Sequence, residues 1–108
     1  MQQNLGKILK GITELQKRVD AAQKEISAGL FDGTAANNLV KVTITGKGEI
    51  RNVFIDPSLM SEDAGTISDL IVVAGNKANE AKEVFSQSKL AGIANGALPL
   101  GLKIPGLG

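Results

Sequence analysis

Apolar residues recur at alternating spacings of three and four along the first quarter of the chain. The positions are Leu5, Ile8, Ile12, Leu15, Val19, Ala22 and Ile26, and together they are called the apolar seam below. This heptad spacing places the side chains on one face of a helix, so it predicts a helix over about Gln3–Ser27. A lone helix of this length is marginally stable in water, and the seam must therefore pack on another surface.

In the middle of the chain the apolar residues recur at every second position instead of in a heptad pattern. The alternating apolar positions are Val40, Val42, Ile44, Val53 and Ile55. Alternation with polar residues is typical of a half-buried strand, and the break at Gly46-Lys47-Gly48 predicts an antiparallel hairpin. We expect a third, weaker strand near Leu30–Thr34, with Asp32-Gly33 as a turn. Asp56-Pro57-Ser58 should close the sheet, because proline cannot donate a ladder hydrogen bond.

A second helix is predicted over about Glu62–Ala91. Its apolar or small positions repeat at 4-3-4-3 and are Ile67, Ile71, Ala74, Ala78, Ala81, Phe85 and Ser88. Ser61 is a suitable N-cap, and Glu62 and Asp63 suit the positive end of a helix. The small residues in the middle of the stripe would permit close approach to a helix or to the sheet.

Glycine and proline are concentrated after the second helix, where Gly92 and Gly96 are expected to end it. We therefore predict one domain over residues 1–91 and a tail over 92–108 that is flexible or docked on the surface. The predicted fold class is α+β: a long N-terminal helix, a small antiparallel three-stranded sheet, a long C-terminal helix and a Gly/Pro-rich tail.

Composition removes most catalytic chemistry. The 108 residues include no His, Cys, Trp or Tyr, so there is no imidazole base, no thiolate nucleophile and no soft metal ligand. We expect no catalytic residues, no metal, no cofactor and no enzymatic activity. No apolar run approaches the 20 or so residues of a bilayer span, which favours a soluble cytoplasmic protein without a membrane partner.

Charge points to one surface of the first helix. The net charge is only +1, so binding to a polyanion would depend on local clustering. Lys10, Lys17 and Lys24 are seven residues apart, opposite the apolar seam, and are called the lysine stripe below; Lys7 and Arg18 flank them. One interpretation is a row of phosphate contacts. The other is that these lysines simply keep the outer face of a packed helix in solvent.

The second helix has the opposite charge balance. Its predicted outer face carries Asp69, Asn76, Glu80, Glu83 and Gln87. That face would repel phosphate, so any polyanion should contact the first helix. Separately, a short sheet leaves two unpaired edges, and the seam is longer than such a sheet can cover; both features indicate a homodimer.

The stretch LVKVTITGKGEIRNVFIDPSLM, residues 39–60, resembles the signature of the YbaB/EbfC family of bacterial nucleoid-associated proteins. The matching features are the strand Val40–Ile44 followed by Gly46, and the segment Val53–Leu59. An amphipathic first helix, an alanine-containing second helix and a tail such as LPLGLKIPGLG occur in the same order in that family. The resemblance covers nearly the whole chain.

The resemblance implies a tweezer-like homodimer in which strands pair across the interface and the helices project as arms. It implies binding of double-stranded DNA in the nucleoid, with a role in chromosome organisation or gene regulation. An alternative is a protein-interaction adaptor linked to DNA replication or recombinational repair, with little intrinsic affinity for DNA. The candidate DNA-binding residues are Lys7, Lys10, Lys17, Arg18 and Lys24.

Overall fold

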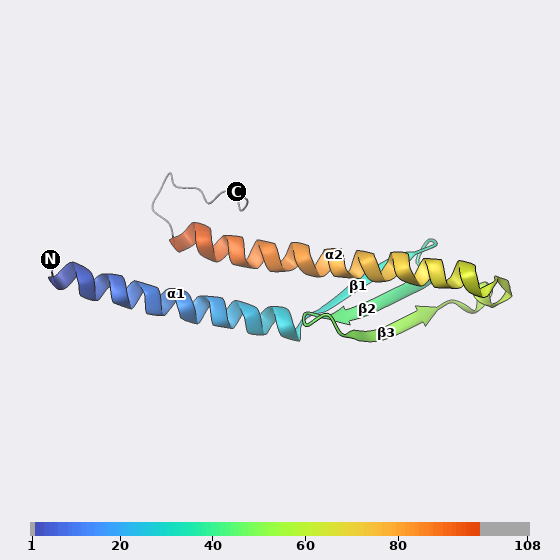
Figure 1. The fold of residues 1–108 in the computed structure, drawn as a ribbon, viewed down its shortest axis with the longest axis horizontal. Coiled ribbons are helices and arrows are strands. Elements are labelled where there is room, and N and C mark those ends of the chain that lie inside the picture. The colour runs from blue at the N-terminus through green and yellow to red at the C-terminus, as the bar shows by residue number, and fades with distance from the viewer. Residues whose placement is uncertain (1, 98–108) are drawn as a thin grey trace.

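The computed structural model describes residues 2–97 and confirms the predicted α+β class. The helix α1 spans Gln2–Ala28 and α2 spans Ala64–Ala97. The strands between them are β1 (Leu30–Ala35), β2 (Val40–Thr45) and β3 (Ile50–Ile55), and a short 3-10 helix, η1, covers Pro57–Ser61. Figure 1 shows the sheet at one end of an elongated molecule, beneath the first half of α2.

The three strands form one antiparallel sheet in the order β1-β2-β3. The hairpin predicted around Gly46-Lys47-Gly48 is present, with Val42 opposite Val53 in the register of β2 and β3. α2 packs mainly on β1 and β2 and leaves β3 largely exposed. The core consequently lies between α2 and the central strand, where Val40 and Val42 are fully buried.

Gly33 allows α2 to lie directly on the sheet. A Cβ atom at this position would come within 2.0 Å of the Ala74 carbonyl oxygen and 2.2 Å of the Ala78 nitrogen. The small residues predicted along the second helix thus face the sheet, and Ala74 and Ala78 are buried there. The prediction that Asp32-Gly33 forms a turn is wrong, because both residues lie inside β1.

The turn after β1 comes later in the chain and consists of left-handed residues. Ala36, Asn37 and Asn38 have φ values of 54°, 54° and 69°, and the Leu39 amide donates to the Ala36 carbonyl at 3.1 Å. Asparagine tolerates this conformation better than most residues do, which explains how the chain reverses without a glycine.

Both predicted ends of the second helix need correction. Ser61 is not its N-cap, because that residue ends η1. Asp63 caps α2 instead: its side chain accepts a 2.7 Å hydrogen bond from the Thr66 amide. At the other end α2 continues through Gly92 and Gly96 to Ala97, since glycine weakens a helix without forbidding it. The remainder of the predicted tail, residues 98–108, lies outside the described part.

The apolar seam of α1 is packed over only half its length. Ala22 and Ile26 are buried, whereas Leu5, Ile8 and Ile12 are about half exposed, at 58%, 57% and 48%. α1 leaves the sheet and runs beside the second half of α2 before projecting beyond it (Figure 1). The principal extents are 73 × 25 × 16 Å, so the projecting end of α1 is an arm rather than part of a compact body.

Candidate nucleic-acid interface

α1 presents all five candidate DNA-binding residues to solvent. Their side chains are exposed along an uninterrupted helix at Lys7, Lys10, Lys17, Arg18 and Lys24. At 1.5 Å rise per residue, the lysine stripe extends over about 21 Å with a charge near every 10 Å. The three lysines share one face because a seven-residue repeat returns to the same side of a helix after two turns, and their place in the heptad puts that face opposite the apolar seam.

Ion pairs shape the charge along this arm. Lys17 lies 3.9 Å from Glu14 on the exposed surface of α1, a contact that solvent and salt weaken. Glu25 lies 3.1 Å from Lys89 of α2, so one of the acids of α1 is paired with the neighbouring helix. Lys10 and Lys24 have no ion-pair partner among the described residues.

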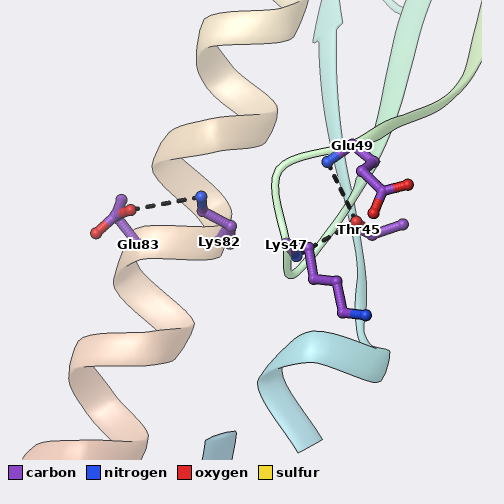
Figure 2. Close-up of polar contacts among 5 residues, drawn as sticks. All are labelled: Thr45, Lys47, Glu49, Lys82 and Glu83. Atoms are coloured by element: carbon purple, nitrogen blue, oxygen red, sulfur yellow. Dashed lines mark hydrogen bonds and ion pairs between the residues drawn. The ribbon is translucent and has the colours of Figure 1, made fainter. Parts of the chain in front are cut away.

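Lys47 joins the lysine stripe at the base of the arm, which the sequence pattern alone did not indicate. Gln23, Lys24 and Ser27 line an open hollow of about 440 Å³ together with Lys47 from the hairpin tip. In Figure 2 the Lys47 side chain extends toward the end of α1. The only sequence signal was the lysine between two glycines, and its proximity to Lys24 depends on how the hairpin docks.

The hairpin is held against α1 by its backbone. The Gly46 amide donates to the Gly29 carbonyl at 3.1 Å, and a Cβ at Gly46 would overlap the Ile26 carbonyl. Inside the loop, the Thr45 hydroxyl accepts hydrogen bonds from the Lys47 and Glu49 amides at 3.3 and 3.2 Å (Figure 2). These contacts determine where Lys47 lies relative to the end of α1.

The acidic face of α2 is exposed, as predicted. Its members Asp69, Asn76, Glu80, Glu83 and Gln87 all lie in solvent. Lys82 of the same helix is largely covered, since it packs beside the hairpin loop, 3.7 Å from Glu83 and facing Gly48. Lys77 is the exposed lysine of α2, and the sheet adds Lys41 and Arg51. By contrast, α1 and the hairpin tip together carry six exposed cations.

Two carboxylates have altered acidity, and both are turn or cap residues. The Ser58 backbone amide, with a smaller contribution from its side chain, lowers the pKa of Asp56. The Thr66 amide lowers the pKa of Asp63 in the same way. Hydrogen bonds to a carboxylate stabilise its charged form. Asp56 and Asp63 thus cap the starts of η1 and α2, and neither resembles a catalytic acid.

Other classes of site have no counterpart among residues 2–97. No group of three or more carboxylates lies in position to hold a metal ion within this described part. Neither described helix is both long and apolar enough to cross a membrane. The lysine stripe is a row of flexible ammonium groups. Groups of this kind can contact phosphates as point charges but cannot read a base sequence.

The whole chain is similar to nucleoid-associated proteins of several bacteria. The family model described as the YbaB/EbfC DNA-binding family matches residues 1–97. The nucleoid-associated protein of Streptomyces griseus is 41% identical over 107 residues, which cover 98% of this chain and 93% of the relative. That of Rickettsia akari is 39% identical over 104 residues, covering 94% and 97% respectively.

A solved structure supports the fold. An uncharacterized protein from Helicobacter pylori superimposes with a TM-score of 0.59 and 24% sequence identity, covering 78% of this chain and 86% of that chain. At this identity the likeness bears on the fold alone. The family match across both helices and the sheet, together with relatives similar over nearly their whole length, shows that the chain belongs to the YbaB/EbfC DNA-binding family.

Proposed function

We propose that this protein is a non-enzymatic, nucleoid-associated protein that binds double-stranded DNA through electrostatic contacts made by α1. The observation that carries the proposal is the exposed lysine stripe on a helix that projects from the body. Lys7, Arg18 and Lys47 widen the positive surface around it. Such contacts neutralise phosphates without reading bases, which suits a role in chromosome organisation or broad gene regulation.

A homodimer would place two such arms on one particle. β3 is an edge strand that α2 leaves largely exposed. Ile50 and Val53 of β3 are 69% and 40% exposed, and Val72 of α2 is 60% exposed. These three residues line a hollow of about 410 Å³ that Val42 and Ile44 also line. We call this hollow the β3 groove. An unpaired strand next to an apolar groove favours pairing with a second copy.

Two arms would strengthen binding even if each contacts DNA weakly. Joining two modules makes the second contact intramolecular, which raises the effective concentration of the second site. The low net charge of +1 is therefore compatible with DNA binding, because binding would depend on the local cations of α1, which a dimer would present twice. We place the complex in the nucleoid of the bacterial cytoplasm.

Fluorescence anisotropy with a labelled random-sequence duplex at a series of salt concentrations tests the proposal. Each phosphate neutralised contributes about −0.9 to the slope of log affinity against log salt. We expect a linear decrease with a slope of several units, and similar affinities for unrelated sequences. A protein that binds no duplex even at low salt would instead favour the adaptor function in replication or recombinational repair.

A further inference from the structure

We propose that residues 98–108 of the same chain dock on the exposed half of the apolar seam of α1. This surface comprises Leu5, Ile8 and Ile12, and neighbouring Leu9 is 57% exposed as well. A run of large aliphatic side chains on the end of an arm is unusual for a surface that contacts only solvent. The position at which α2 ends identifies the occupant.

α2 ends where the seam becomes exposed. The two helices run in opposite directions, as Figure 1 shows, and the 3.1 Å ion pair between Glu25 and Lys89 fixes their alignment. Ala97 is eight residues beyond Lys89, or about 12 Å along the axis. The same advance along α1 leads from Glu25 to Lys17. Half-buried Leu15 and Val19 lie near this point, and the exposed part of the seam continues beyond it.

The remaining sequence has the pattern needed to cover this surface. Leu98, Leu100, Leu102 and Ile104 alternate with Pro99, Gly101, Lys103 and Pro105. In an extended chain alternate residues share a face, and proline favours extended backbone at the residue before it. Seven extended residues reach about 20 Å, whereas Leu5 and Ile12 are only about 10 Å apart along α1. The segment is therefore long enough to lie over the whole exposed stretch.

The β3 groove is a poorer destination for the same segment. Its α2 residues centre on Gly75, which is 22 residues, or about 33 Å, before the end of the helix. An eleven-residue segment stretched to its limit reaches about 38 Å, so almost no apolar residues would be left to fill the groove. The seam of α1 begins beside the end of α2 and needs no such extension.

Paramagnetic broadening in the full-length protein tests this contact. The chain has no cysteine, so Gly101→Cys provides one attachment site for a nitroxide, on the side of the segment away from its leucines. Docking predicts that the methyl signals of Leu5, Ile8 and Ile12 lose most of their intensity. The methyl signals of Val40 and Val42, inside the core, should keep theirs.

Two further samples separate docking within one chain from its alternatives. Leu102→Ser in the labelled protein should restore the seam signals, whereas the neighbouring control Lys103→Ser should not. In a mixture of spin-labelled and isotope-labelled chains, docking within one chain predicts no broadening between copies. Unbroadened seam signals, broadening seen only between copies, or broadening centred on Ile50 and Val53 would each overturn the proposal.

Discussion

Single residues determine how closely the layers of this protein approach. Gly33 is the tightest point, because the backbone of α2 occupies the space that any side chain there would need. Gly46 has the same role against the end of α1. At each of these positions the glycine is required by contact with another backbone, which cannot move aside as a flexible side chain could.

Replacement of Gly33 by alanine should destabilise the fold strongly. The added methyl group would force α2 away from the sheet, and we expect a loss of about 3 kcal/mol or more in the free energy of unfolding. Urea denaturation followed by circular dichroism measures this change. Gly92→Ala is the matched control: that helical glycine has open space around it, so it should be neutral or stabilising by up to about 1 kcal/mol. Equal effects would contradict the close approach.

Asp63 should stabilise α2 in a pH-dependent manner. Its pKa lies below the ordinary value of 3.8 because the Thr66 amide donates to the carboxylate. A lowered folded-state pKa gives stabilisation that is present above the unfolded value and disappears as pH falls through the folded value. Asp63→Ala should thus lower the melting temperature at pH 7, with the difference shrinking below about pH 4. Ser61→Ala, the comparison variant, should melt like the parent, and a larger effect there would restore Ser61 as the cap.

Among the elements, α1 differs most from its expected packing. One periodic pattern covers the whole helix, yet only its second half contacts the rest of the described chain. The packed part includes Ala22 and Ile26, and the exposed part includes Ile8 and Ile12. Periodicity specifies which face of a helix is apolar, whereas the length over which that face is covered depends on where its partner helix ends.

Truncation along the seam should show this division. Ile26→Ala removes a buried side chain and should cost about 2–4 kcal/mol of folding free energy. Ile12→Ala removes a side chain that is half exposed among residues 2–97 and that the proposed docked segment would cover from one side only, so it should cost less, about 1–2 kcal/mol. Urea melts of the two variants check the contrast. A loss at Ile12 as large as that at Ile26 would mean that the distal arm is fully packed.

Local patterns predicted the elements well and their junctions poorly. The alternation at Val40, Val42 and Ile44 and the repeat from Ile67 to Phe85 depend on burial of one face, which leaves a direct periodic trace. The turn at Asn37-Asn38 depends on left-handed backbone, and the cap at Asp63 depends on a single hydrogen bond. Several neighbouring residues could fill either role, so the sequence does not single one out. The hollow that Lys47 and Lys24 both line could not be foreseen, because it requires the docked positions of two separate elements.

For the molecule as a whole, self-association is the property that a simple measurement can test. If copies pair through the β3 groove, Val53→Glu should convert the dimer to a monomer, because pairing would bury an uncompensated charge. Val53 is 40% exposed in the single chain, so folding should survive. Leu30→Glu, at the opposite sheet edge, is the control and should remain dimeric. Sedimentation equilibrium at micromolar concentration distinguishes these outcomes, and a monomeric parent would refute the dimer.

A tweezer-like dimer, as proposed above, would present the lysine stripe twice on one particle. Each of two arms would carry Lys10 beyond the end of α2, with Lys17 near that end and Lys24 at the base of the arm beside the hairpin. We therefore expect DNA affinity to depend on where the charges lie on the molecule and not on their total. A comparison of two variants with equal net charge separates these possibilities.

The most direct measurement compares duplex binding by Lys10→Gln/Lys17→Gln/Lys24→Gln with binding by Lys41→Gln/Arg51→Gln/Lys77→Gln. Every replaced side chain is exposed. At the four helical positions glutamine suits a helix about as well as lysine, whereas Lys41 and Arg51 lie on β2 and β3. Circular dichroism and sedimentation should first show that both variants fold and associate like the parent. In anisotropy titrations, loss of the stripe should weaken binding strongly and flatten the salt dependence by about 0.9 for each phosphate contact removed, while the control set should bind nearly as the parent does. Equal losses in the two variants, or a loss confined to the control set, would contradict the assignment of DNA binding to α1.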